Sequence, residues 1–356
     1  MTSEVAEPGS GVPIRRSLAW IDAARVAAIL AVIAIHVVSP LVTNRALPES
    51  SWFGNAVDSA ARWAVPLFVM ISGALLLHSD LADDPLSFYR RRLSRIVPPL
   101  VAWTAIYLVI GHLTVNNPAT MNIAGYSVLA GRPSSHLYFL YLIAGLYLVA
   151  PFLRPLVRLA DRRNLGIAVV VFLALGIADD LIIAWGGIGQ VNATTRFVPY
   201  IGYFLAGAWL VGLAPTRSRI VAAAAVTVVG ILATALGTEL LIQRLGMGRG
   251  LYLYEYLSVT TVPVSLAVFV LFVWSAPAIE RMAARLPRGW LSTVAASTLG
   301  IYVIHPLVLG GLGRVGLSAR AFLVPLAVPA AVLVTFGVSL LLVLVLRRLP
   351  AVRRLV

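Results

Sequence analysis

The sequence predicts an all-α, polytopic integral membrane protein with about ten transmembrane helices and cytoplasmic N- and C-termini. Its composition is the first reason, because 60% of the 356 residues are hydrophobic and only 12% are charged. The mean hydropathy is strongly positive, which is not typical of a water-soluble globule of this length. The other two reasons are a series of long apolar stretches and an uneven distribution of arginine. We therefore expect a multi-pass protein of the cell membrane, plasma or inner, in contact with the lipid bilayer.

Ten apolar stretches are long enough to cross a bilayer. In chain order they are Trp20 to Leu41, Trp52 to Leu77, Ile96 to Leu113, Leu137 to Leu156, Leu165 to Trp185, Phe197 to Leu213, Ile220 to Leu236, Leu257 to Ser275, Trp290 to Leu312 and Phe322 to Leu346. Together they form one predicted membrane domain, residues 20–346. The longest connections, Thr114 to His136 and Gly237 to Tyr256, are predicted to be outer loops.

The arginines set the predicted orientation. All 28 basic residues are Arg, and placing the N-terminus inside puts most arginine clusters in the cytoplasm, as the positive-inside bias requires. These clusters are Arg15 and Arg16; Arg90, Arg91, Arg92 and Arg95; Arg154, Arg158, Arg162 and Arg163; Arg217 and Arg219; Arg281, Arg285 and Arg288; and Arg347, Arg348, Arg353 and Arg354. The formal net charge of +14 is therefore a topology signal, and we expect no nucleic-acid partner.

The two ends of the chain are predicted to lie outside the membrane domain. Residues 1–19 lack the short apolar core of a cleavable signal peptide, so we expect a disordered cytoplasmic lead-in. Residues 347–356 are predicted to form a basic cytoplasmic tail.

Two ionisable residues share one face of the first apolar stretch. Arg25 and His36 are eleven residues apart, which on an α-helix leaves an angular offset of about 20° and an axial separation of roughly 16 Å. Ionisable side chains inside a membrane are costly, so their default interpretation is a functional site. The structural alternatives for Arg25 are pairing with Asp22 or extension of the side chain to the interface.

A first polar layer is predicted near the cytoplasmic surface. Arg25 lies there with Arg92 and Arg95, which begin a helix that continues past Pro98 and Pro99. Arginines at a cytoplasmic opening make multidentate contacts with phosphates, so this layer is a candidate site for a nucleotide-bearing donor. For the neighbouring Arg90 and Arg91, the positive-inside bias alone is a sufficient explanation.

A second polar layer is predicted at the outer side, and several separate segments contribute to it. Its residues are His36, Arg62, His136, Asp179, Asp180, Arg196, Tyr200, Glu255 and His305. Charges at similar depth in many segments indicate a water-filled pocket that receives a polar acceptor such as a sugar. Arg196, Glu255 and His136 fall near predicted helix ends, where an interfacial position explains them equally well.

The available side chains favour acid–base chemistry by histidine. A histidine of near-neutral pKa can take a proton from a hydroxyl and return it, which is the minimum chemistry for acyl transfer to an alcohol. We expect no metal site, because the five histidines lack metal-ligand spacing and the chain has no cysteine. The sequence also lacks a GxSxG elbow and a Walker-type GxxxxGK, which disfavours serine-hydrolase and ATP-driven mechanisms.

The motifs together resemble the membrane acyltransferase 3 family. Trp20 through Arg25 to His36 resembles the family's opening signature, an arginine or lysine followed after ten residues by histidine. Val65 to Gly73 resembles its second-helix signature, Arg92 to Arg95 its cytoplasmic RxxR, and Tyr302 to Pro306 its late YxxHP element. His136 to Tyr141 and Gly145 to Pro151 are similar to the branch of surface polysaccharide O-acyltransferase-like proteins, which includes the enterobacterial common antigen O-acetyltransferase. That branch commonly has tryptophan at the position of Tyr138.

The resemblance implies an enzyme, an acyltransferase, and specifically an O-acetyltransferase. It implies acyl-CoA, usually acetyl-CoA, as a donor substrate bound from the cytoplasm, with no permanently bound cofactor, and His36 as the catalytic residue. The acceptor is then a hydroxyl of a cell-envelope polysaccharide, a glycolipid or an exported metabolite. We therefore assign His36 and Arg25 to catalysis, and Arg92, Arg95 and Arg25 to the donor. The predicted acceptor pocket contains Arg62, His136, Tyr138, Asp179, Tyr302 and His305.

Two points stay open at this stage. Direct attack by the acceptor hydroxyl and transfer through an acyl-histidine fit the sequence equally well. The competing functional class is a polytopic transporter or flippase of a polar envelope precursor, in which the two polar layers act as gates. That alternative calls for inverted repeats with broken helices in matching positions, and the sequence shows no such symmetry. A non-catalytic membrane scaffold does not account for so many charges within the spans.

Overall fold

The computed structural model describes residues 19–78, 84–115 and 120–356, and within these residues every regular element is helical. The helices are α1 (Ala19–Thr43), α2 (Pro48–Ala61), α3 (Ala64–Leu77), α4 (Pro85–Val115), α5 (Thr120–Leu129), α6 (Tyr138–Leu159), α7 (Arg162–Leu181), α8 (Ile201–Leu210), α9 (Arg217–Gly250), α10 (Thr261–Trp274), α11 (Ala276–Ala283), α12 (Trp290–Ala296), α13 (Thr298–Arg314) and α14 (Val324–Leu346). The short turns η1 (Ile182–Gly186), η2 (Val198–Tyr200) and η3 (Leu251–Tyr254) extend three of them. The lead-in predicted for residues 1–19 lies outside the described residues, except that Ala19 begins α1.

The described helices confirm a multi-pass membrane fold. Seven helical segments are long and apolar enough to cross a bilayer. The number of such segments rises to nine if the bent pairs α10–α11 and α12–α13 each count as one span. The predicted span from Phe197 to Leu213 corresponds to a shorter apolar helix, Val198–Leu210. The described part of the chain therefore supports seven to nine spans of the ten expected.

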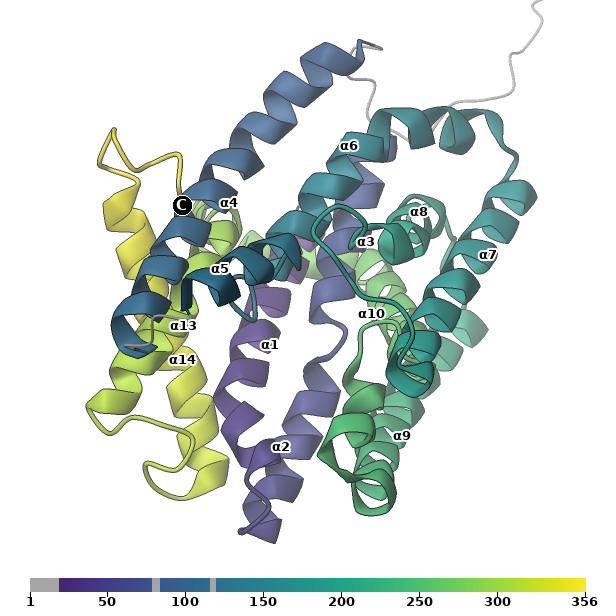
Figure 1. The fold of residues 1–356 in the computed structure, drawn as a ribbon. Helices are drawn as coiled ribbons and strands as arrows, with labels where there is room; N and C mark the ends of the chain where they lie inside the picture. The colour runs from purple at the N-terminus through teal and green to yellow at the C-terminus, as the bar shows by residue number, and fades with distance from the viewer. Residues whose placement is uncertain (1–18, 79–83, 116–119) are drawn as a thin grey trace, which may run out of the picture.

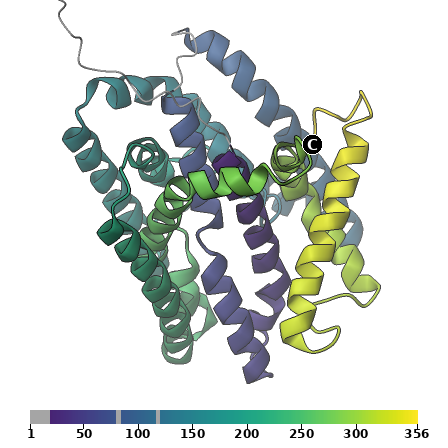
Figure 2. The same ribbon diagram turned by 180° about the vertical axis from the view of Figure 1, so that it is seen from behind.

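Helix α1 is the central element of the bundle. It packs against α2 and α3 on one side and against α12, α13 and α14 on the other. Figure 1 shows α1 and α2 in the middle, with α4, α5, α13 and α14 to one side and α7 to α10 to the other; Figure 2 shows the same arrangement from behind. The side chains of Ala24, Ala28 and Ile29 are fully buried, because neighbouring helices cover α1 along its length.

A break separates α2 from α3 in the middle of the second predicted span. The cause is Pro66, which has no N–H to donate to the carbonyl oxygen of Arg62, four residues earlier, and whose ring clashes with that carbonyl. Helix α2 accordingly ends at Ala61 and α3 begins at Ala64. The break places Arg62 at a junction inside the bundle.

Helix α9 is longer than the sequence predicted. The expected span ended at Leu236 and was followed by an outer loop, whereas the helix runs to Gly250 with a kink at Gly246, where φ is 79°. Polar residues of the expected loop have partners in the bundle: Glu239 forms an ion pair with Arg45, and the side chain of Gln243 donates to the carboxylate of Glu239 over 2.9 Å. The other predicted outer loop also contains a helix, α5.

Glycines allow α3 and α8 to cross at very short range. A Cβ atom at Gly207 would overlap the carbonyl oxygen of Met70, and one at Gly73 would overlap that of Phe204. Small residues at helix contacts are how membrane helices bring their backbones together. This contact fixes α3, which forms one wall of the candidate site.

We predict that Gly207→Ala destabilises the protein by about 1–3 kcal/mol or more, because a methyl group has no space at this crossing. The measurement is thermal unfolding of the purified protein in detergent. The matched control is Gly337→Ala in α14, where an added Cβ meets no atom within 4 Å. Equal unfolding temperatures for the two variants would contradict the tight crossing.

Candidate active site

Three histidines from separate helices meet in the interior of the bundle. His36 lies in α1, His136 precedes α6 by two residues and His305 lies in α13. The ring centroid of His36 is 5.0 Å from that of His305 and 6.2 Å from that of His136, and the other two are 5.6 Å apart. His136 and His305 are buried, whereas His36 is only partly buried. We call these three residues the histidine cluster.

Backbone and hydroxyl groups hold the buried members of this cluster. Nδ1 of His305 lies 2.8 Å from the carbonyl oxygen of Tyr302, and Nδ1 of His136 lies 3.2 Å from the hydroxyl of Ser134. On both rings the opposite nitrogen, Nε2, is buried without a hydrogen-bond partner among the described residues. Because the His136 ring also interacts with the backbone of Val303, the clearest nitrogen without a partner in the cluster is Nε2 of His305.

Tyrosines connect the histidine cluster to neighbouring helices. The hydroxyl of Tyr302 donates to the carbonyl oxygen of His136, and that of Tyr107, in α4, donates to the carbonyl oxygen of Val303 over 2.9 Å. The ring of Tyr107 lies edge-on to His136, with centroids 4.8 Å apart. Tyr107 did not stand out in the sequence, because a single tyrosine in an apolar span is also typical of an ordinary packed helix.

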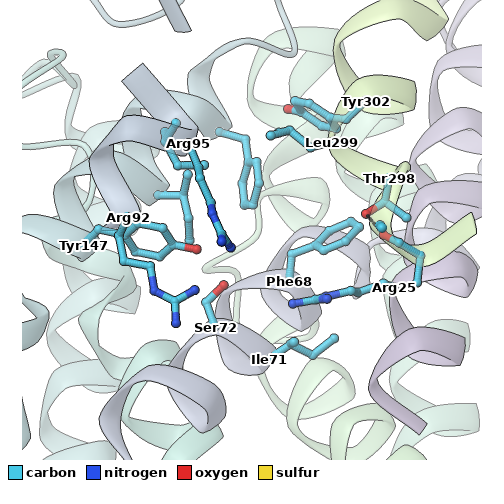
Figure 3. A pocket seen from close by; sticks show the side chains of 15 residues that line it. Arg25, Phe68, Ile71, Ser72, Arg92, Arg95, Tyr147, Thr298, Leu299 and Tyr302 are labelled. Atoms are coloured by element: carbon cyan, nitrogen blue, oxygen red, sulfur yellow. Dashed lines mark hydrogen bonds between the residues drawn. The ribbon is translucent and has the colours of Figure 1, made fainter. Parts of the chain in front are cut away.

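A cavity of about 270 Å³ lies next to the histidine cluster. Its polar lining consists of Arg25, Ser72, Arg92, Arg95, Tyr147, Thr298 and Tyr302. Figure 3 shows the guanidinium groups of Arg25, Arg92 and Arg95 directed into this space, with Tyr302 at its far end. We call it the arginine cavity. It is lined by all three arginines of the predicted inner layer, one from α1 and two from α4, and it reaches the edge of the cluster at Tyr302.

None of the three arginines of this cavity forms an ion pair within the described part of the chain, although the carboxylate of Asp22 lies close enough to Arg25 for their charges to interact. Arg25 forms no ion pair with Asp22, and neither Arg92 nor Arg95 forms an ion pair or a side-chain hydrogen bond there. The pairing with Asp22 considered for Arg25 is therefore absent. Guanidinium groups grouped around one cavity have the chemistry that anionic groups such as phosphates require of a binding site.

Arg62 is held by partners on two sides. Its Nη2 lies 2.5 Å from the carboxylate of Asp58, and its Nη1 donates to the carbonyl oxygen of Tyr254 over 3.0 Å. Its Nε is buried without a hydrogen-bond partner among the described residues. The charge of Arg62 also acts electrostatically on His36. One N–H of this arginine thus remains available near the cluster.

Two residues of the predicted acceptor pocket, Tyr138 and Asp179, make no ring contact or hydrogen bond with the histidine cluster within the described residues. Tyr138 stacks on Tyr256 with ring centroids 6.3 Å apart, and the guanidinium carbon of Arg196 lies 5.7 Å from the Tyr138 ring centroid. Asp179 lines a separate cavity of about 650 Å³. The chain therefore brings His136, Tyr302 and His305 to His36 and places Asp179 at a second site.

This second cavity, the charged cavity, contains side chains of both signs. Its charged lining residues are Arg132, Arg196, Arg249, Asp179, Asp180 and Glu255, and its aromatic ones are Tyr126, Tyr200 and Tyr252. Within the described residues none of these six charged side chains forms an ion pair with another. Sequence inspection missed Arg132, Arg249 and Tyr252, because they lie in segments expected to be loops.

The described residues contain no group of three or more His, Cys, Asp or Glu side chains arranged to hold a metal ion. The rings of the histidine cluster are near one another but do not converge on a common point in that way. The arrangement instead offers imidazole nitrogens, unpaired guanidinium groups and tyrosines, which are the groups of acid–base and anion-binding chemistry.

The described structure is thus a polytopic helical bundle with an interior histidine cluster and an arginine-lined cavity. The family model described as an acyltransferase domain, Acyl_transf_3, matches residues 18–344, which is nearly the whole chain. The chain belongs to the acyltransferase 3 family and is a membrane acyltransferase. No curated protein and no solved structure matches it. The family resemblance in the motifs is thereby confirmed, whereas the particular branch remains a prediction.

We predict that Asp58→Ala destabilises the protein by about 3–5 kcal/mol, because it leaves the Arg62 charge without its buried counter-charge. Thermal unfolding in detergent measures the change, with Glu49→Ala, an exposed acid on the same helix, as control. Combining Asp58→Ala with Arg62→Met should recover a large part of the loss. If the double variant is no more stable than Asp58→Ala, the ion pair does not have this role.

Proposed function

We propose that this chain transfers an acyl group, acetyl in particular, from cytoplasmic acyl-CoA to a hydroxyl of a cell-envelope glycan, a glycolipid or an exported metabolite. The observation that carries the proposal is the adjacency of the arginine cavity and the histidine cluster: Tyr302 lines the cavity and its ring lies 5.6 Å from that of His136. In this proposal the bundle crosses the bilayer ten times with both termini in the cytoplasm, and the arginine cavity opens on the cytoplasmic side.

The donor proposal rests on unpaired charge. Coenzyme A carries several phosphates, and guanidinium groups bind phosphate oxygens through two parallel N–H bonds. Arg25, Arg92 and Arg95 face the same cavity and form no ion pair in the described part of the chain. The apolar walls formed by Phe68, Ile71, Phe139 and Ile143 suit the thioester arm, which carries no charge.

The route from the donor to His36 passes Tyr302. His36 does not line the arginine cavity; Tyr302 stands between the cavity and the rings of His136 and His305. In our proposal the thioester reaches the histidine cluster by displacing or passing the Tyr302 ring. The cavity wall at this point is the bend between α12 and α13, which measures 63°.

In the proposed reaction His36 is the general base. The acceptor oxygen attacks the thioester carbonyl carbon, the C–S bond breaks, and the proton taken up by His36 passes to the departing CoA thiolate. The negative charge that develops on the carbonyl oxygen needs a donor. Arg62 supports this role better than Tyr302, because its Nε is unbonded within the described residues, whereas the hydroxyl proton of Tyr302 is used by the carbonyl of His136.

The charged cavity is the proposed acceptor site. Tyrosine rings such as Tyr200 and Tyr252 stack on sugar faces, and charged side chains such as Asp179 and Arg132 bind hydroxyl and charged substituents. Tyr138 and Tyr256, stacked beneath Arg196, lie on the path that we propose from this cavity toward Arg62, whose guanidinium carbon is 5.9 Å from the Tyr256 ring centroid. The O-acetyltransferase branch to which the motifs are similar acts on acceptors of this kind.

We predict that His36→Ala lowers acyl transfer by about 10²- to 10⁴-fold, because the general base is removed. The assay incubates purified protein with labelled acetyl-CoA and candidate glycans and measures acceptor-dependent release of free CoA. His78→Ala, at the end of α3, is the control and should retain activity. Transfer by His36→Ala at the rate of the unmodified protein would reject the assignment.

We predict that Arg92→Ala and Arg95→Ala each raise the KM for acetyl-CoA by about 10- to 100-fold. A hydrogen bond to a charged group contributes about 1.5–3 kcal/mol, which corresponds to this range. Arg90→Ala is the matched control, since Arg90 lies on the same helix but does not line the cavity. An unchanged KM in both cavity variants, or an equal rise in the control, would rule out the donor site.

A further inference from the structure

His305 has no part in the reaction steps proposed above, although its ring is the nearest neighbour of His36 in the cluster. The side chain is 0% exposed, and its ring centroid lies 5.0 Å from that of His36. A buried imidazole is costly unless its polar atoms are satisfied. The hydrogen bonding of the two nitrogens therefore indicates what this residue does.

The Nδ1 atom of His305 must carry a proton. It lies 2.8 Å from the carbonyl oxygen of Tyr302 and 3.2 Å from that of Ile301, and carbonyl oxygens accept hydrogen bonds but cannot donate them. Both acceptors belong to the same helix as His305, so the bond is built into α13. In a neutral ring with a protonated Nδ1, the other nitrogen, Nε2, has a lone pair and accepts.

The Nε2 atom of His305 is an acceptor without a donor. It is buried and has no hydrogen-bond partner among the described residues. Two imidazole rings joined end to end by an N–H···N bond have centroids about 5 Å apart, and the His36–His305 separation is 5.0 Å. No hydrogen bond joins the two rings among the described residues, but catalytic hydrogen bonds often tighten only when substrate binds.

We propose that His305 is a positioning residue whose Nε2 accepts a hydrogen bond from His36 and so fixes the tautomer of His36. The second nitrogen of His36 then has its lone pair free for the acceptor hydroxyl. No proton moves onto His305: the acceptor proton goes to the free nitrogen of His36 and from there to the CoA thiolate. This inference rests on the proposed role of His36 as general base.

The test is a spectroscopic one on the full chain in detergent or nanodiscs. The protein is labelled with ¹⁵N-histidine, which gives five ring systems, and the His36→Ala and His305→Gln variants assign two of them. We expect His305 with a protonated Nδ1 and an unprotonated Nε2, and His36 in a single tautomer. A His305 ring protonated at Nε2, or a His36 ring present as a mixture of tautomers, would overturn the proposal.

Two variants of His305 distinguish a role in positioning His36 from a role in packing alone. In His305→Gln the side-chain amide reaches the place of Nε2 and retains an acceptor, whereas in His305→Asn it reaches only the place of Nδ1. We expect His36 to keep its single tautomer in the Gln variant and to become a mixture in the Asn variant, with kcat lower by about 10²-fold or more in the latter and KM for acetyl-CoA unchanged. The same His36 spectrum in both variants would refute the proposal.

The tautomer measurement also distinguishes this inference from the proposed function. If His36 and His305 show the expected tautomers but the protein transfers no acyl group, the His305–His36 bond is established and the transferase mechanism is rejected. Acyl transfer with a His36 tautomer that does not depend on position 305 would leave the transferase standing and reject the bond. Where a variant loses its monodisperse peak in size-exclusion chromatography, the spectrum of the unmodified protein gives the decision.

Discussion

Where a helix breaks inside an apolar bundle, some carbonyl oxygens lose their helical N–H partners. They need another hydrogen-bond donor from the protein, because lipid supplies none. Two such breaks border the candidate site, and an arginine lies at each. Arg347 donates to the carbonyl oxygen of Ala296 and the hydroxyl of Ser297 where α12 meets α13, whereas Arg62, between α2 and α3, donates to the carbonyl oxygen of Tyr254 at the end of η3. Broken helices in membranes occur where they line a cavity, and both breaks here are next to the histidine cluster or the arginine cavity.

The cluster itself is held by bonds between main chain and side chain that cross from helix to helix. Tyr107 ties α4 to Val303 of α13, and Tyr302 ties α13 to the carbonyl of His136. These bonds satisfy polar groups that would otherwise be buried unpaired, and they set the positions of two histidines relative to α1. The rings of His136 and His305 are thus held by hydrogen bonds to backbone and hydroxyl groups, whereas His36 contacts the other two rings.

Part of this arrangement was predictable from the sequence because it depends on spacing within one segment. The apolar runs predicted the helices, the Arg25 to His36 spacing marked α1, and the motif set identified the family. The sequence placed His36, His136 and His305 in one polar layer, but it did not predict that their rings lie 5.0 to 6.2 Å apart, because that distance depends on how the helices pack. The extension of α9 past Leu236 was not predicted for a related reason. Glu239 is buried in an ion pair with Arg45, which lies almost two hundred positions earlier in the chain.

The interruptions between α2 and α3 and between α12 and α13 were not predicted from the sequence, although Pro66 indicated that the helix there could be distorted. A proline in a membrane helix is compatible with a smooth kink or with a full interruption, and the neighbouring helices determine which one forms. The charged cavity was only partly foreseen, because α5 and the end of α9 were expected to be loops. Polar residues in such segments look like ordinary surface positions until the packing that surrounds them is known.

The crossing of α3 and α8 has a mechanical consequence. Since backbone touches backbone there, the two helices cannot slide or separate without losing contact along the whole crossing, and they move together as one body. Phe68, Ile71 and Ser72 of α3 therefore form a stationary side of the arginine cavity. The facing side contains the bend of 63° between α12 and α13, which places Ala295, Ala296 and Thr298 on the cavity wall opposite α3.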